Sequence, residues 1–145
     1  MKFIFASLVL LVASVQLALA DVYSQLQFMK IISPTNGQSI EAGSDIVLQY
    51  VMQPTVYEGT SNGYAKSLQV NFHTRSGESK LEQVAHVCTD CPVAAKESKY
   101  VTYTKSYKIP ADTAPGSYAL DFVELVQLRR SQITSTETVS INIVN

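Results

Sequence analysis

The feature that most constrains the fold is a two-residue alternation of apolar and polar side chains within short segments. In residues 67–74 (SLQVNFHT), Leu68, Val70 and Phe72 share one parity and polar residues share the other. Because successive side chains of a β-strand point to opposite faces, this pattern predicts a strand with one buried face and one face in water. It places His73 on the face in water.

Segments of this kind recur along the chain, and clusters of glycine, proline, asparagine and serine separate them. An antiparallel sheet with one apolar face needs a second sheet to cover that face. The sequence therefore predicts an all-β fold, an immunoglobulin/fibronectin-III-like antiparallel β-sandwich of about seven strands. Because the chain has no tryptophan, we expect Tyr50 to be the core aromatic. The predicted strands are residues 28–33, 45–52, 67–74, 80–87, 100–109, 117–128 and 133–144.

Residues 117–128 begin with the same alternation, but Val123 and Leu125 then fall on the opposite parity to the apolar residues before them. This change predicts a β-bulge or a second buried face in that strand. Asp121 and Glu124 are the only close acidic pair on a predicted strand. Their spacing of three places them on opposite faces, as solvated or bulge-associated charges, so they do not form the facing carboxylates of a glycosidase.

The first twenty residues predict a secretory signal peptide. Lys2 precedes an apolar run over residues 3–15, and small residues lead to a cleavage site after Ala20. The run is short of the ~20 residues that a membrane-spanning helix needs. We therefore expect a signal peptide at 1–20 and a single domain at 21–145.

The net charge and the C-terminal sequence limit the partners and the cellular location that we expect. Without Lys2, 10 basic residues face 12 acidic residues, a net charge near −2, so neither nucleic acid nor an anionic membrane is an expected partner. The last residues (VSINIVN) carry no lipid-anchor signal, and no N-glycosylation sequon occurs. We expect a secreted protein, extracellular or associated with a cell wall, without a membrane anchor.

Residues 86–92 read HVCTDCP and hold both cysteines. In an exported protein, Cys88 and Cys91 are expected to form a disulfide. The Cα atoms of a disulfide lie about 4.4–6.8 Å apart, whereas an extended chain would hold these two near ~10 Å. The pair therefore predicts a turn centred on Thr89 and Asp90, and the proline that follows is expected to end the strand.

Two other interpretations of this motif stay open. His86, Cys88 and Cys91, with His73 as a fourth ligand, have the number and type of groups that bind zinc or copper. Alternatively, the cysteines form a redox pair, although no helix pattern begins there to stabilise a thiolate. The alternative function is therefore that of a secreted metal- or redox-handling protein.

The sequence holds no catalytic signature. It lacks the G-x-S-x-G and H-E-x-x-H motifs and has only two histidines. The predicted mature chain begins with Asp21, not with the histidine that secreted copper oxygenases use as a metal ligand. We therefore expect no enzymatic activity and no cofactor.

Tyrosines supply the candidate binding surface, since aromatic rings serve as platforms for sugars and the chain has eight tyrosines. Tyr57 and Tyr64 flank the polar loop EGTSNG, and Tyr100 begins a strand on a polar face. We predict these three as ligand-binding residues, the alternative being that they only cover loop and sheet surface. Tyr103 and Tyr107 share a face with apolar residues and are expected in the core.

Two stretches resemble a known family. Residues 31–52 (IISPTNGQSIEAGSDIVLQYVM) and 110–122 (PADTAPGSYALDF) are similar to the fungal secreted immunoglobulin-like domain of Ser/Thr-rich cell-wall proteins, the killer-toxin-resistance/KNH-like family associated with β-1,6-glucan assembly. The resemblance implies an immunoglobulin-like fold, an extracellular wall-associated setting and no catalytic residues. Tyr50 stands where the family pattern has tryptophan, and the Ser/Thr-rich tail is missing. A small secreted relative made of this module alone is the expectation.

These observations lead to one functional expectation. The chain is expected to be a secreted non-catalytic module at the fungal cell wall or surface. Its expected partner is a wall polysaccharide, glucan or chitin, or an extracellular protein, including one from a host.

Overall fold

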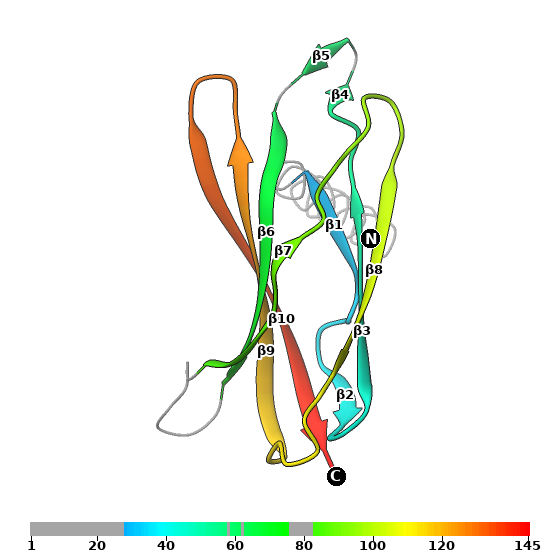
Figure 1. The fold of residues 1–145 in the computed structure, drawn as a ribbon, viewed down its shortest axis with the longest axis vertical. Coiled ribbons are helices and arrows are strands. Elements are labelled where there is room, and N and C mark those ends of the chain that lie inside the picture. The colour runs from blue at the N-terminus through cyan, green and yellow to red at the C-terminus, as the bar shows by residue number, and fades with distance from the viewer. Residues whose placement is uncertain (1–27, 58, 62, 76–82) are drawn as a thin grey trace, which may run out of the picture.

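The computed structural model describes residues 28–57, 59–61, 63–75 and 83–145, and its elements are all β-strands (Figure 1). The predicted signal peptide lies outside these residues. Within the described ranges, no helix is long and apolar enough to cross a membrane. The strands are β1 (Met29–Ser33), β2 (Gln38–Glu41), β3 (Asp45–Met52), β4 (Val56–Tyr57), β5 (Thr60–Ser61), β6 (Tyr64–Thr74), β7 (Gln83–Cys91), β8 (Val101–Lys108), β9 (Gly116–Gln127) and β10 (Gln132–Val144).

Two sheets face each other and form a β-sandwich (Figure 1). One sheet has the order β1-β3-β8 and the other β2-β10-β9-β6-β7, while β4 and β5 form a separate two-stranded ribbon. The pairs are antiparallel except for β2 and β10, which are parallel. The consecutive strands β1 and β2 belong to different sheets, so the chain crosses between the layers at Pro34–Gly37. This arrangement confirms the predicted fold class.

Each of the seven predicted segments overlaps one of the longer strands. The strands β2, β4 and β5 were not predicted, because two to four residues are too few to show a periodicity. The segment predicted at 80–87 was placed too early. The observed strand, β7, continues to Cys91, and residues 80–82 lie outside the described part of the chain.

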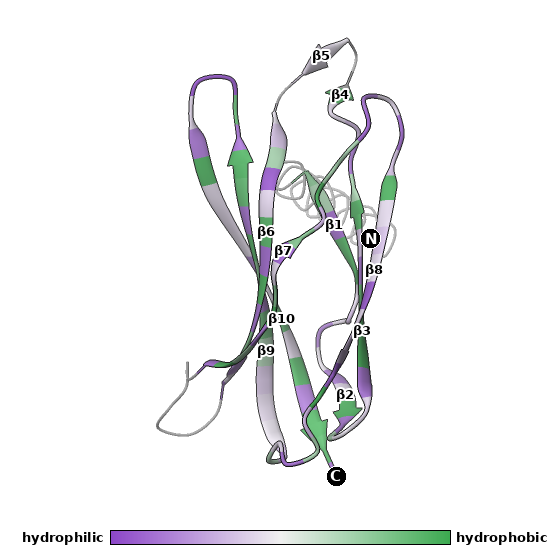
Figure 2. Ribbon diagram, viewed as in Figure 1, coloured by the Kyte–Doolittle hydropathy of each residue, from purple (hydrophilic) through white to green (hydrophobic). Residues whose placement is uncertain are grey.

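The core lies between the sheets and is built from alternate apolar residues of the strands. The ribbon in Figure 2 shows hydrophobic and hydrophilic residues alternating along the strands. In β3, Ile46, Leu48, Tyr50 and Met52 are all buried, and the residues between them are exposed or half-buried. Burying one such side chain stabilises the fold by about 1.5–3 kcal/mol. The largest fully buried side chains are Tyr50, Phe72, Phe122, Met29, Ile46, Leu48, Met52, Leu68, Ile109, Leu120, Ile141 and Glu124.

Tyr50 is the core aromatic, as predicted. Its hydroxyl donates a hydrogen bond to the carbonyl oxygen of Pro92 at 2.6 Å, and its ring centroid lies 5.6 Å from that of Tyr103. Tyr103 and Tyr107 are half-buried and pack against the core, which confirms their predicted side of β8. Tyr50 therefore connects the core to the segment that follows β7.

Tyr118, near the start of β9, forms a second aromatic anchor. Its hydroxyl donates to the carbonyl oxygen of Ala114 at 2.7 Å, four residues upstream, and its ring stacks on Phe72 at 5.0 Å. A tyrosine at this place with this backward hydrogen bond is the tyrosine corner typical of immunoglobulin-like sandwiches. The corner fixes the entry of the chain into β9.

The prediction that His73 faces water is wrong. The residue is on the outer face of its sheet, as its parity requires, but it is buried among neighbouring strands. Its Nε2 lies 3.0 Å from Oδ2 of Asp121 on β9, and its Nδ1 lies 2.9 Å from the carbonyl oxygen of Thr74. Because that carbonyl only accepts, Nδ1 carries a proton. An outward position in a central strand of a sheet can therefore be closed to solvent.

The parity change in β9 has a different cause from a bulge. β9 pairs with β10 in one continuous register, and Val123 and Leu125 are half-buried on the outer face. The inner parity continues through Glu124, which occupies a core position between buried neighbours. Asp121 and Glu124 do lie on opposite faces, as predicted, but Glu124 is not solvated. A charged residue type at a core position thus produced the apparent break in the pattern.

Candidate functional site

Cys88 and Cys91 form the predicted disulfide, with their Cα atoms 5.6 Å apart. The predicted turn is wrong, because β7 continues through both cysteines. Across the pairing, Cys91 is opposite Leu68 and Cys88 is opposite Val70, so three residue steps on β7 match two on β6. The extra residue forms a β-bulge, which draws the cysteines together. Proline follows β7 directly, as predicted.

The set of groups for the metal alternative is not assembled in this structure. Both thiols are in the disulfide, so neither offers a thiolate. The side chain of His86 points to amides, with Nδ1 at 2.7 Å from Oδ1 of Asn71 and Gln83 within 2.9 Å, while His73 pairs with Asp121. Among the residues that the structure describes, no three His, Cys, Asp or Glu side chains are grouped to hold a metal ion.

One end of the sandwich gathers three loops, residues 53–63, 92–100 and 128–131, which we call the loop end (Figure 1). The loops come together because β3 ends and β8 begins there, with Met52 paired to Val101. Main-chain hydrogen bonds fix them: Thr55 N to Lys96 O at 3.0 Å, Val56 N to Glu97 O at 3.1 Å and Leu128 N to Ser131 O at 2.7 Å.

The three predicted tyrosines all belong to this end. Tyr64 begins β6 and is 48% exposed, and Tyr100 precedes β8 and is 70% exposed. Tyr57 lies in β4, at the same end, and its side chain is outside the described part. Tyr57 and Tyr64 are close in sequence, but Tyr100 reaches them only through the pairing of β3 with β8. The structure therefore places the predicted residues on one end of the molecule.

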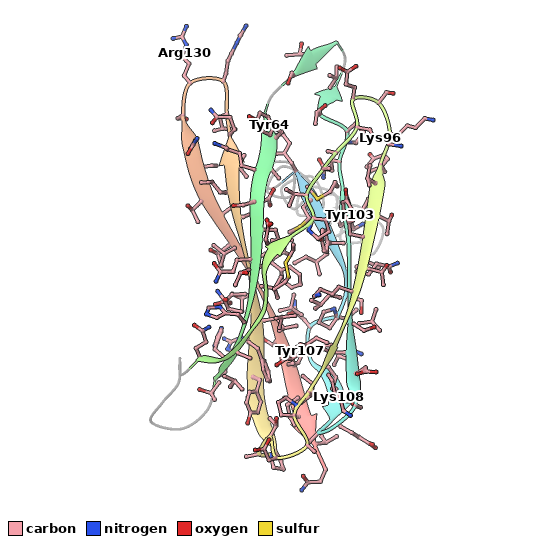
Figure 3. All side chains as sticks on the ribbon, in the orientation of Figure 1. Tyr64, Lys96, Tyr103, Tyr107, Lys108 and Arg130 are labelled. Atoms are coloured by element: carbon pink, nitrogen blue, oxygen red, sulfur yellow. A yellow bond between two sulfur atoms is a disulfide. The ribbon has the colours of Figure 1, made fainter. Side chains whose placement is uncertain are left out.

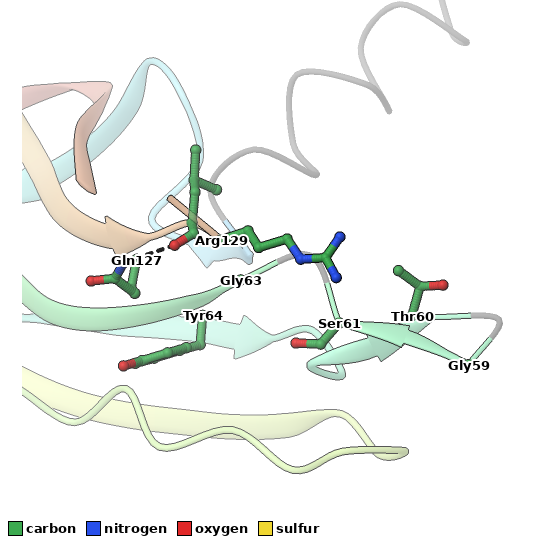
Figure 4. Close-up of a pocket in the computed structure, with 8 residues that line it drawn as sticks. Gly59, Thr60, Ser61, Gly63, Tyr64, Gln127 and Arg129 are labelled. Carbon is green, nitrogen blue, oxygen red and sulfur yellow. Dashed lines mark hydrogen bonds between the residues drawn. The ribbon is translucent and has the colours of Figure 1, made fainter. Parts of the chain in front are cut away.

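A groove of about 490 Å³ opens between β5 and the turn that joins β9 to β10 (Figure 4). Gly63 makes this close approach possible: it has φ +141°, and a Cβ there would collide with the carbonyl oxygen of Gln127 and lie 3.2 Å from Leu128. The main chain at Gly63, just before β6, thus contacts the main chain at the end of β9 directly. The lining residues are Gly59, Thr60, Ser61, Gly63, Tyr64, Gln127, Leu128 and Arg129.

Polar side chains and glycines make up most of the lining residues of the groove, although carbon atoms form the larger part of its surface. In Figure 4 the Arg129 side chain extends toward Ser61 and Thr60, whereas the Tyr64 ring leaves β6 on its other side. The Gln127 amide is engaged within the hairpin, since Nε2 donates to the carbonyl oxygen of Leu128 at 2.7 Å. The two hydroxyls and the guanidinium are therefore the groups that the groove offers to a ligand.

Sequence reasoning missed this groove, including Thr60, Ser61 and Arg129. The two walls are more than sixty residues apart in the chain, and neither is apolar or catalytic in type. The one signal that could have pointed to it is the pair Arg129 and Arg130 in a predicted hairpin turn, where exposed charge is not needed for folding.

A buried acid, Glu124, and a half-buried one, Glu137, lie further along the same hairpin. Glu124 is 1% exposed, and neither of its carboxylate oxygens has a hydrogen-bond partner among the described residues. Burial, with Glu137 nearby, raises the pKa of Glu124 to about 8. Glu137 is on the same inner face of β10, diagonally across from it, and burial raises its pKa as well. Neither carboxyl lines the groove.

No family model and no curated protein matches this chain. Solved structures resemble it in fold at low identity. They include fibronectin(III)-like modules from Clostridium thermocellum (21% identity, 79% of this chain, 93% of the other, TM-score 0.39) and a Niemann-Pick type C2 protein from the Japanese carpenter ant (15%, 80%, 89%, 0.45). A lytic polysaccharide monooxygenase from Streptomyces lividans also matches (10%, 75%, 59%, 0.43). Likeness at this level carries no information on ligand or activity.

Proposed function

We propose that this chain is a secreted, non-catalytic immunoglobulin-like module that binds polysaccharide through its loop end, at a fungal cell wall or cell surface. The sequence of residues 1–20 supports export, and the resemblance in residues 31–52 and 110–122 supports the fungal setting. A single domain at 21–145 is part of the same proposal.

The observation that carries the proposal is the gathering of exposed tyrosines and a polar groove on the loop end. Tyr64 and Tyr100 keep large ring surfaces in water, so they are not held there by the core. Aromatic rings bind the apolar faces of sugars, and hydroxyl groups such as those of Thr60 and Ser61 pair with sugar hydroxyls. Main-chain hydrogen bonds hold these groups on a rigid sandwich, which lowers the entropy cost of binding.

The test is retention of purified protein (residues 21–145) on insoluble glucan and on chitin. The double variant Tyr64→Ala/Tyr100→Ala is expected to lose at least about tenfold in affinity, because truncating exposed aromatic anchors typically costs more than 1 kcal/mol each. Val47→Ala is the control, since Val47 is 43% exposed on β3 and lies toward the end of that strand away from the loop end. Unchanged retention of the tyrosine variant, or no retention of the wild type on either polysaccharide, contradicts the proposal.

A further inference from the structure

We infer that the groove of the loop end recognises an anionic glycan, with the Arg129 guanidinium pairing with a carboxylate, sulfate or phosphate group of the sugar chain. The inference rests on the proposed function and names the class of polysaccharide. It starts from Arg129, which lines the groove and has no ion pair or hydrogen bond to any residue that the structure describes. Guanidinium stays charged at all physiological pH values and offers five N–H donors in a fork that fits an oxyanion.

The charges of the loop end point the same way. Lys96, Lys99, Arg129 and Arg130 belong to its three segments, and Glu97 is the acidic residue among their described positions, which leaves 4 − 1 = +3. Counting the charge of Glu58, whose position is outside the described part, gives +2. Residues 21–145 carry a formal charge of 10 − 12 = −2, so everything beyond the loop end has a formal charge of −4, or −3 with Glu124 protonated. Figure 3 shows Arg130 and Lys96 at the loop end and Lys108 at the opposite end.

This distribution favours an anionic ligand that approaches the loop end. An acidic chain is attracted to the positive end and repelled by the rest of the surface, which orients it toward the groove. A neutral glycan could accept hydrogen bonds from the guanidinium but would gain no charge–charge attraction from it. Charge complementarity therefore selects among polysaccharides.

The lining of the groove favours a glycan over an acidic peptide. Protein interfaces are built around aromatic or aliphatic anchors that become fully buried. In this groove Leu128 is the one aliphatic side chain among the lining residues, and the other groups beside Arg129 are glycines, hydroxyls, an amide and a tyrosine. In Figure 4 the Arg129 side chain extends toward the wall that carries Thr60 and Ser61, so a glycan whose charged group pairs with Arg129 would have these hydroxyls beside it. A volume of about 490 Å³ is in the range of small-ligand sites.

The test compares soluble polymers by calorimetry at low and high salt: polygalacturonate for carboxylate, dextran sulfate for sulfate, and neutral laminarin and dextran. Wild type is expected to bind an anionic polymer at least about tenfold more tightly than a neutral one. Arg129→Gln/Arg130→Gln is expected to lose at least about tenfold of that affinity and part of its salt dependence. Lys105→Gln/Lys108→Gln, which removes the same charge from exposed residues of β8, is the matched control and is expected to change it less than about twofold.

The possible results distinguish a failure of the anionic-glycan inference from a failure of the proposed polysaccharide binding. Equal losses in the two double variants mean non-specific attraction and overturn the inference. Binding of laminarin that is indifferent to Arg129 overturns it as well, while leaving the polysaccharide-binding function standing. Polyglutamate bound as tightly as polygalacturonate reassigns the groove to acidic peptides. Failure of every glycan, including insoluble glucan and chitin, removes the proposed function itself. Thermal melts confirm that both variants are folded.

Discussion

The hairpin of β9 and β10 carries unpaired charged residue types in two opposite environments. At its turn, Arg129 and Arg130 are both exposed, and Arg129 lines the groove. Five residues before Arg129, Glu124 is closed off between the sheets. Both guanidinium groups are exposed to solvent and available to a ligand. The carboxyl of Glu124 is buried and has no hydrogen-bond partner among the described residues, which raises its pKa to about 8, so it keeps its proton at neutral pH. We call the paired part of β9 and β10 the stem of the hairpin. Charged residue types lack partners in both places, but in the exposed turn this leaves them available to a ligand, whereas in the buried stem it leads to protonation.

The largest effect expected from this comparison is a pH-dependent loss of stability caused by Glu124. Its pKa of about 8 in the folded protein lies above the ordinary value of 4.5, so between these values the folded protein holds a proton that the unfolded chain releases. The stabilisation is complete below about pH 4.5 and is lost as the pH rises through about 8. Glu124→Gln should therefore exceed wild type at pH 9 by on the order of a few kcal/mol in free energy of unfolding.

Urea unfolding of both proteins at pH 5, 7 and 9 measures this difference. Glu97→Gln, which changes an exposed carboxyl of the loop end, serves as the control and should follow wild type at each pH. If Glu124→Gln differs from wild type by the same amount at pH 5 and pH 9, Glu124 is not a buried neutral acid and the comparison between stem and turn fails.

A smaller effect is expected from the disulfide on β7. Like Glu124, it is part of the buried structure and not of the exposed turn, because Cys91 is 2% exposed and packs in the core. Cys88→Ala/Cys91→Ala should lower the free energy of unfolding by about 2 kcal/mol, the loop-closure value for so short a ring. Polysaccharide binding should stay unchanged, since the bulge is not part of the groove. Denaturant unfolding and glycan retention are the two measurements.

Intact mass of the secreted protein decides the state of the cysteines. The expected mass is lower by two hydrogens than that of the reduced chain beginning at Asp21, with no metal adduct under native conditions. Free thiols with a stoichiometric metal would support the alternative centred on His86, Cys88 and Cys91 and would move the functional site from the loop end to β7.

The smallest effect on stability is expected at the turn. Arg129→Gln/Arg130→Gln should change the free energy of unfolding by less than about 0.5 kcal/mol at every pH, because both side chains are exposed and pair with no described residue. Together with a large loss of anionic glycan binding, unchanged stability would show that the turn contributes to binding and not to the stability of the hairpin. A stability loss above 1.5 kcal/mol, measured by thermal melting, would mean that the turn also holds the hairpin together.

The strands were predictable because their signal is local. Alternation over eight residues is enough to mark β3, whose predicted and observed bounds agree. The burial of Glu124 was not predicted, because the buried face of each strand was assigned from side-chain polarity, and a carboxyl in a core position breaks that assumption. The burial of His73 was not predicted, because the burial of a residue on the outer face depends on which strands flank its own strand.

The loop end was only half predictable. Tyr64 and Tyr100 were identified from exposed positions beside turns, one residue at a time. Their meeting on one end depends on the pairing of β3 with β8, and the groove depends on the contact of β6 with the end of β9. Contacts between segments that are distant in the chain leave no pattern in either segment alone, so sequence reasoning had no access to them.

The contact at Gly63 fixes the width of the groove, whereas the side chains that line the groove do not set this width. Main-chain atoms of β6 and β9 set the distance between the walls, because no side chain stands between them there. Thr60 and Ser61 sit on the far wall and can be exchanged without moving either wall. Any side chain at position 63 would push the hairpin away and alter the width of the groove. Keeping glycine at this position is therefore what keeps the width of the groove.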